Sequence, residues 1–393
     1  MFSAITFNAF AIFITSLISD FSMTHHFNPF FFESPAARQA FTDREELAAR
    51  LVAFMRQRGR RMLVHGLRRM GKTSLILNAG RISKENLVFV DVSTATNLNE
   101  VARNLLLAAP REEESLLLKL FRLAQKHFSS VTLGAGGIQL TGELRPDEGP
   151  KNLQSVLTYL NDRAGAEDKP LTICLDEFQD LRLLGGERID WQIRGIIQHF
   201  ENVNFIFAGS DYRLVKWMTE PNAAFFNQLQ MMEVGPIDTS LLVKWMAGRA
   251  KIGGLAAFPF GQDIVEMAGP RTGDIIRLAM SCFELAAAGE TPAGQVAAKA
   301  FDLVTFSEKT YEFSSRWHDC SLVQRAVLRA IALGFAPTAA ETVRKFELGT
   351  TSTAHSALKT LLKRQILTRD IEGEIKFDSP FFSHWCATQG ARP

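Results

Sequence analysis

Short apolar runs alternate with segments of helical periodicity over the first 236 residues of the chain. Several of these runs are apolar at nearly every position, which is typical of central strands buried on both faces. Because the segments between them are helical in pattern, we predict a parallel sheet with crossover helices. The predicted strands are RMLV at 61–64, LVFVDV at 87–92, LTICL at 171–175, NFIFA at 204–208 and QMMEV at 230–234.

A long insertion separates the second and third predicted strands. Its first part, residues 97–128, has helical periodicity, and its second part, 130–144, reads SVTLGAGGIQLTGEL. The glycine-rich centre of the second part is typical of a turn between two short strands. We therefore predict a helix and a β-hairpin in the insertion.

The pattern beyond residue 236 becomes helical. These segments predict a small helical lid at 237–310, after a core domain at 23–236. Three helices are predicted in the lid, and they start at 238 or 239, at 273–274 and at 291–292.

The last part of the chain, residues 311–393, combines helices with a terminal hairpin. Three helices followed by two short antiparallel strands are the elements of a winged helix. The predicted helices lie at 322–333, 339–346 and 351–363, and the predicted strands, ILTRDI and EIKFDS, lie at 366–371 and 374–379.

The most specific motif lies between the first predicted strand and the helix after it. Residues 66–73 fit the pattern GxxxxGK[ST] of a phosphate-binding loop. Such a loop turns its backbone N–H groups toward phosphates, and side chains at the glycine positions would obstruct it. Lys72 is predicted to reach the β and γ phosphates, and the Thr73 hydroxyl to bind Mg²⁺. The residues expected to hold the nucleotide are Gly66, Leu67, Arg68, Arg69, Met70, Gly71, Lys72, Thr73 and Ser74.

Two acids end the predicted strand LTICL. Asp176 can hold Mg²⁺ there, and Glu177 can polarise the attacking water as a general base. Many strands end in a solvated acidic turn, but the upstream phosphate loop favours the catalytic interpretation. No NKxD-type guanine motif is visible in the sequence, so ATP with Mg²⁺ is the predicted cofactor. The predicted fold class is α/β, a P-loop NTPase core with a five-stranded parallel sheet, followed by a helical lid and a C-terminal winged helix.

Three further polar residues are candidates for sensing the γ phosphate. Ser210 follows the strand NFIFA, and a polar side chain at the tip of the strand next to the acidic one can touch the γ phosphate or the attacking water. A plain strand-end turn is an equal alternative for Ser210. In the helical lid, Arg277 or Arg271 could report hydrolysis, and an ordinary surface arginine is an equal alternative.

Composition limits the other functions of the chain. Lys and Arg number 44 against 42 Asp and Glu, so a net charge of +2 gives no whole-protein attraction to nucleic acid or anionic lipid. The four cysteines are far apart and form no CxxC pair. Their spacing favours a reducing, cytoplasmic compartment over a disulfide framework or a zinc site.

The first 22 residues are apolar and lack a basic flank. Three interpretations stay open for this segment. It is an upstream mis-called start with Met23 as the true initiator, a docking or buried helix, or a membrane anchor. The missing basic flank argues against the anchor, and thus against a membrane partner.

An ordered set of motifs resembles the archaeal-type ATPases of the STAND branch of AAA+ proteins, relatives of the origin recognition ATPases. The set extends from about Phe27 to Trp385 and comprises FTDREEL, VHGLRRMGKTSLI, CLDEFQDL, FAGSDYRL, VGPID and FDSPFFSHW. The resemblance implies an ATP-driven switch. It also implies that Arg44 lies near the adenine and that Pro236 contacts the base.

Two features depart from that family. The segment AAFFNQLQ at 223–230 carries no arginine before the last core strand, which argues against a family-style arginine finger. Without an arginine in this segment, we expect either slow basal hydrolysis or an arginine supplied from elsewhere. The spacing Gly-Asp-x-x-Arg before Arg277 is one residue longer than the spacing often found in related ATPases.

The predicted recognition helix suits double-stranded DNA. Residues 318–393 carry ten Lys or Arg against seven Asp or Glu. The resulting net charge of +3 is low for a domain that binds the phosphates of DNA. Small polar residues early in the helix and basic residues later suit major-groove entry. Many winged helices serve only as docking modules, and the resemblance favours DNA. The residues concerned are Thr351, Ser352, His355, Ser356, Lys359, Lys363 and Arg364.

The leading hypothesis is a Mg²⁺-dependent ATPase that couples its nucleotide state to a DNA-binding winged helix. One alternative is a DNA-binding regulator for which ATP is only an occupancy signal. Another is an ATP-gated switch in signalling or defence, with little turnover and no DNA binding, that meets a protein partner or a second copy of itself.

Overall fold

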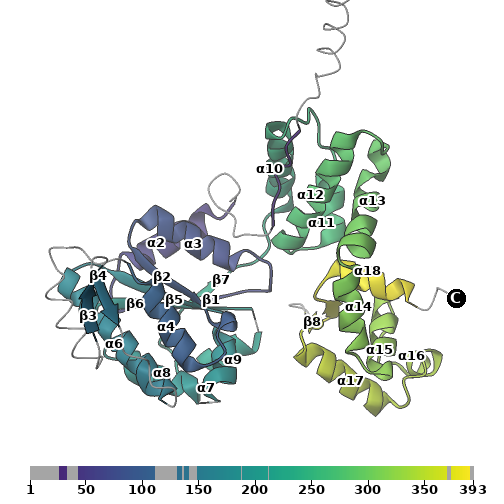
Figure 1. The fold of residues 1–393 in the computed structure, drawn as a ribbon. Coiled ribbons are helices and arrows are strands. Elements are labelled where there is room, and N and C mark those ends of the chain that lie inside the picture. The colour runs from purple at the N-terminus through teal and green to yellow at the C-terminus, as the bar shows by residue number, and fades with distance from the viewer. Residues whose placement is uncertain are drawn as a thin grey trace, which may run out of the picture. The chain divides into compact units, whose positions relative to one another are not determined.

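The structure is a computed structural model that describes residues 26–32, 43–110, 131–134, 137–140, 148–186, 188–210, 212–369 and 373–389. Two compact units make up the chain, and each is considered by itself (Figure 1). The core unit contains the described residues of 32–238 together with 270–273. The helical unit contains the described residues of 26–31, 239–269 and 274–389.

A five-stranded parallel sheet organises the core unit. Its strand order is β2-β5-β6-β1-β7, and every adjacent pair is parallel. The strands are β1 (Arg61–His65), β2 (Asn86–Asp91), β5 (Leu171–Asp176), β6 (Val203–Gly209) and β7 (Gln230–Glu233). The structure therefore confirms the five strands and the parallel sheet that the apolar runs predict.

Helices cover both faces of this sheet (Figure 1). Strand β5 is buried on both faces, since Leu171, Ile173 and Leu175 pack into the cluster on one face and Cys174 into the cluster on the other. The first face carries α4 (Leu98–Ala108), α6 (Gly149–Glu167), α7 (Leu181–Gly185), α8 (Ile189–Ile197) and α9 (Tyr212–Thr219), and the second carries α2 (Glu45–Met55) and α3 (Lys72–Ser83).

The insertion contains the predicted hairpin. Strand β3 (Val131–Gly134) pairs antiparallel with β4 (Gly137–Leu140). Helix α4 ends earlier than predicted, because Ala109 precedes Pro110 and takes an extended conformation with ψ 142°. The rest of the predicted helix, at 111–128, lies outside the described residues.

The helical unit begins with four helices and continues into the winged helix. The first four are α10 (Thr239–Ile252), α11 (Gly261–Ala268), α12 (Thr272–Ala288) and α13 (Val296–Leu303). The first two residues of α12 belong to the core unit. The remaining elements are α14 (Thr310–His318), α15 (Leu322–Ala332), α16 (Ala340–Lys345), α17 (Thr351–Lys363), β8 (Leu367–Arg369), β9 (Ile375–Phe377) and α18 (Pro380–Thr388). The predicted helices and hairpin of the winged helix are all present, and α14 and α18 flank them.

The described residues before residue 32 pack on the helical unit, although the core was predicted to begin at residue 23. Phe30 is buried among the rings of Trp245, Phe258 and Phe283. The apolar segment 1–22 lies outside the described residues. No helix in the described part of the chain has both the length and the apolarity to cross a membrane.

Candidate nucleotide site

The loop between β1 and α3 has a backbone that requires its glycines. Gly66 has a φ of +151°, and a Cβ added there would lie 2.4 Å from the carbonyl oxygen of Val234. Gly71 has a φ of +88°, in the left-handed region that favours glycine. Residues 66–74 therefore turn sharply from the end of β1 into the first turn of α3.

The Lys72 side chain folds back over this loop. Its Nζ donates to the carbonyl oxygens of Gly66 and Leu67, each at 2.9 Å, and the residue is only 6% exposed. Burial lowers the pKa of the ammonium group, while the carboxylates of Glu177 and Asp176 oppose that shift. A buried cation that holds only carbonyl oxygens gains from an anionic ligand such as a phosphate.

Thr73 and Asp176 form the second part of the site. The Thr73 Oγ1 donates to the Asp176 Oδ2 at 2.6 Å, and the backbone N–H of Glu177 donates to the Asp176 Oδ1 at 3.0 Å. Asp176 is 4% exposed, and burial raises the pKa of its carboxyl group although the hydrogen bond from Thr73 opposes the shift. A hydroxyl and a carboxylate are hard oxygen donors of the kind that Mg²⁺ prefers. The residues present therefore fit a magnesium ion.

A chain of hydrogen bonds holds the carboxylate of Glu177. Ser210 follows β6, which lies between β1 and β5, and its Oγ donates to the Glu177 Oε2 at 2.9 Å. The Arg68 Nε donates to the Ser210 Oγ at 3.4 Å, and the Gln179 Nε2 donates to the same Glu177 oxygen. The structure thus brings Arg68, Ser210 and Glu177 together.

Sequence reasoning missed Gln179. It is a buried polar residue two positions after Glu177, in the short turn Phe178–Asp180. Glu177 itself has a φ of +48°, so the backbone reverses there and brings the Gln179 amide back to the carboxylate. A polar residue close behind the acid pair was the only local signal for this role.

Arg44 contacts both the phosphate loop and the segment that follows β7. Its Nη2 donates to the Met70 carbonyl oxygen at 3.0 Å and to the Gly235 carbonyl oxygen at 2.7 Å. Burial lowers the pKa of this guanidinium. Gly235 directly precedes the exposed Pro236, so Arg44 and Pro236 border the same segment. Their contacts with the base stay predictions.

The two candidate sensor arginines have different surroundings. Arg271 lies in the segment 270–273 of the core unit, where the Gly273 N–H donates to the Arg69 carbonyl oxygen of the phosphate loop at 2.9 Å. Arg277 lies in the helical unit, and its Nη1 pairs with the Glu308 Oε2 at 3.0 Å. The sensor role of either arginine stays a prediction.

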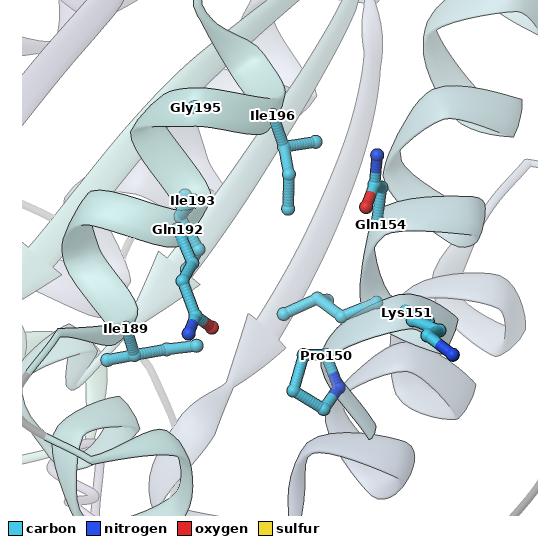
Figure 2. Close-up of a pocket in the computed structure, with 9 residues that line it drawn as sticks. Pro150, Lys151, Gln154, Ile189, Gln192, Ile193, Gly195 and Ile196 are labelled. Carbon is cyan, nitrogen blue, oxygen red and sulfur yellow. The ribbon is translucent and has the colours of Figure 1, made fainter. Parts of the chain in front are cut away.

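A separate hollow of about 330 Å³ lies between α6 and α8 (Figure 2). Apolar side chains line most of it, with Gln154 and Gln192 facing it from the two helices. It contains none of the motif residues and is not part of the nucleotide site.

Comparisons with known proteins agree with this architecture. Residues 311–388 match the family described as "Probable winged helix domain". No curated protein matches the sequence. Among solved structures, the Walker-type ATPase PABY2304 of Pyrococcus abyssi is similar with a TM-score of 0.63 and 19% identity, covering 91% of this chain and 99% of that one.

Two origin-recognition proteins of Aeropyrum pernix are also similar. The ORC2 protein, solved as ADPNP-ADP complexes, has a TM-score of 0.56 and 14% identity, covering 88% of this chain and 92% of its own. The ORC1 protein, solved in complex with DNA, has a TM-score of 0.50 and 15% identity, covering 90% and 94%. The chain therefore has the fold of the archaeal Walker-type and origin-recognition ATPases, a P-loop core followed by a C-terminal winged-helix domain.

Proposed function

We propose that the protein is a Mg²⁺-dependent switch that binds and hydrolyses ATP. The observation that carries this proposal is the contact between Thr73 and Asp176 at 2.6 Å, directly beside a Glu177 carboxylate held by Ser210. A phosphate loop alone binds nucleotides of many kinds. A metal-binding pair next to an oriented carboxylate adds the parts that hydrolysis requires.

Each side chain has a distinct role in this proposal. Lys72 exchanges its carbonyl partners for the β and γ phosphate oxygens, and Thr73 and Asp176 hold the magnesium ion. When bound, that ion neutralises charge on the phosphates. Glu177 accepts a proton from the attacking water, and Ser210 keeps the carboxylate turned toward it. No arginine lies within 223–230, so we propose a slow basal rate.

The contact between Arg69 and Gly273 supports coupling of the nucleotide to the helical unit. The Arg69 carbonyl oxygen belongs to the phosphate loop, and Gly273 lies in the first turn of α12. Helix α12 continues through Ala288 into the helical unit, which also contains the winged helix. A change in the loop on phosphate binding would therefore act on the start of this helix.

Double-stranded DNA is the partner that α17 supports best. Ser352, His355, Ser356, Lys359 and Lys363 are all exposed, and their spacing places them along one side of the helix. None of these residues is acidic. Arg364 contributes less to this face than predicted, because its Nη1 donates to the Asp319 carbonyl oxygen at 2.9 Å. The DNA complex of the similar ORC1 protein supports the same partner.

The alternative is an ATP-gated switch in signalling or defence that binds a protein partner or a second copy of the chain. Tyr311 and Leu322 favour it, because these large side chains of the winged-helix region are 88% and 80% exposed. The four cysteines are all buried and free, which is compatible with a reducing cytoplasm in either case.

The test is ATP hydrolysis by the full chain, with and without duplex DNA, beside a Lys72→Ala variant. We expect Mg²⁺-dependent turnover that rises with DNA and disappears in Lys72→Ala. Turnover that is equal in the variant would contradict the proposed site. ATP binding without turnover, unchanged by DNA, would favour the protein-interaction switch.

A further inference from the structure

A basic pocket lies at the amino ends of β1 and β7. Its volume is about 270 Å³, and its polar lining comes from Arg60, Arg61, Asn227, Gln228 and Gln230. The phosphate loop follows the other end of β1, so about 15 Å of strand separates the pocket from the nucleotide site. The basic pocket is therefore a separate site in the core unit.

A third arginine, Arg194 of α8, contacts Gln228 in the lining of this pocket. With its amide oxygen turned toward Arg194, the Gln228 side chain accepts hydrogen bonds from the Arg194 Nε at 3.2 Å and Nη2 at 3.0 Å. The same guanidinium lies 5.5 Å from the centre of the Trp191 ring, which is 41% exposed. The positive charge of the pocket thus continues to an exposed aromatic surface.

No described carboxylate balances these arginines. Arg60, Arg61 and Arg194 form no ion pair within the described residues, whereas nearby Arg58 pairs with Asp168 at 2.9 Å. The Arg61 Nη2 donates to the Ile197 carbonyl oxygen at 2.7 Å, but its buried Nε has no hydrogen-bond partner in the described part of the chain. Burial lowers the pKa of Arg61, and the charge of Arg194 lowers it further.

These observations indicate that the positive charge of the pocket is not compensated by any described carboxylate. A partly buried guanidinium that lacks an acidic partner carries a desolvation cost, which a bound anion offsets. Guanidinium groups match the oxygens of phosphate, and the side-chain amides of Asn227 and Gln230 add neutral donors at the rim.

We propose that the basic pocket binds a phosphate group through Arg60, Arg61 and Arg194. The phosphate belongs either to a free anion or to the backbone of a nucleic-acid strand, because both present the same oxygens. Trp191 beside Arg194 offers a surface on which a base of such a strand can stack. The proposal is independent of ATP hydrolysis.

The first test measures pyrophosphate binding by isothermal titration calorimetry. All variants are made in a Lys72→Ala chain, so that the phosphate loop does not compete for the probe. We expect Arg60→Gln and Arg61→Gln each to weaken binding about tenfold. Arg58→Gln is the matched control, because it removes the same charge from an arginine that already has an acidic partner, and it should change affinity less than about twofold.

The second test uses a fluorescent single-stranded 12-mer and the anisotropy of its complex at several salt concentrations. If Arg60→Gln and Arg61→Gln weaken its binding and reduce the salt slope by about one unit each, the phosphate comes from nucleic acid. If the two variants weaken the binding of pyrophosphate but not of the 12-mer, the phosphate that the pocket binds belongs to a free anion.

Three results would overturn the proposal. The parent chain binds neither probe, the Arg60 and Arg61 variants bind both probes as the parent does, or Arg58→Gln loses as much affinity as they do. Arg60 is exposed and its side chain has no hydrogen bond in the described residues, so Arg60→Gln tests the pocket even if Arg61→Gln fails to fold.

Discussion

The Oγ1 of Thr73 donates a hydrogen bond of 2.6 Å to the Oδ2 of Asp176, which lies 103 positions further along the chain. The two residues meet because β1 and β5 are parallel strands whose carboxyl ends lie at one edge of the sheet. Strand β6 lies between them, and Ser210 at its end fills the space between the phosphate loop and the acid pair.

Replacing Asp176 by Asn should stabilise the protein without nucleotide at neutral pH. Burial raises the pKa of this carboxyl group in the folded state, so between the unfolded and folded pKa values the folded chain holds more protons. The free energy of unfolding therefore falls as the pH rises between these two pKa values. Above the folded pKa, the full destabilisation by the ionised Asp176 is present. Asn carries no charge, and its amide oxygen can still accept one of the two hydrogen bonds, from Thr73 or from the Glu177 N–H.

Thermal unfolding followed by circular dichroism checks this expectation. The midpoint of Asp176→Asn should exceed that of the parent at pH 7, and the difference should shrink below about pH 4, where the Asp is protonated in both states. The same variant should lose Mg²⁺-dependent ATP hydrolysis by about 100-fold or more. A lower midpoint at pH 7 would show that the ionised carboxylate stabilises the fold.

Glu177→Gln and Ser210→Ala distinguish the role of the general base from that of the hydroxyl that orients it. Glu177→Gln keeps the side-chain shape but removes the proton acceptor, so hydrolysis should fall about 100- to 1000-fold while ATP stays bound. Ser210→Ala removes one hydrogen bond to a carboxylate that Gln179 also holds, so a loss of about tenfold is expected. Single-turnover rates and ATP affinities of the two variants measure the loss of hydrolysis and the retention of ATP. Equal losses in the two variants would mean that Ser210 itself acts on the phosphate or the water.

The phosphate loop and the acid pair could be predicted from sequence because their signals are local. The loop motif is contiguous, and Asp176 and Glu177 directly follow an apolar strand. The full strand order has no such signal, because periodicity says which residues are buried and not which strands pair. Ser210 was predicted at the tip of the strand next to the acidic one, but its hydrogen bond to Glu177 depends on side-chain positions that the pattern does not give.

Helix α18 shows a different limit of the prediction. Its starting signals are local, since the Ser379 side chain caps the helix at the Phe382 N–H and Pro380 occupies the first turn. Its aromatic residues hide the helical period, because Phe381, Phe382 and Trp385 are all buried. The ring centre of Phe382 lies 5.1 Å from that of Phe313 in α14, so the two helices missing from the winged-helix prediction pack on each other.

Gly66→Ala should destabilise the core unit and weaken ATP binding. The new Cβ would lie 2.4 Å from the Val234 carbonyl oxygen, and the φ of +151° is strained for alanine. A cost of about 2 kcal/mol or more in the free energy of unfolding follows. The control is Gly195→Ala in α8, where nothing lies within 4 Å of the added Cβ and alanine favours the helix. Urea unfolding should show a loss for Gly66→Ala only, and equal stability of the two variants would contradict the close approach.

Replacing Lys359 and Lys363 by Ala should weaken duplex DNA binding and flatten its salt dependence. The two lysines are exposed on α17, and each one that contacts a phosphate releases about one counterion. The slope of log affinity against log salt should therefore decrease by about two units in the double variant. Lys299→Ala in α13 removes an exposed charge from the same unit and should leave the slope unchanged, as anisotropy titrations at several salt concentrations can establish. If the double variant keeps the parent slope while the parent binds DNA, α17 is not the DNA-contacting helix.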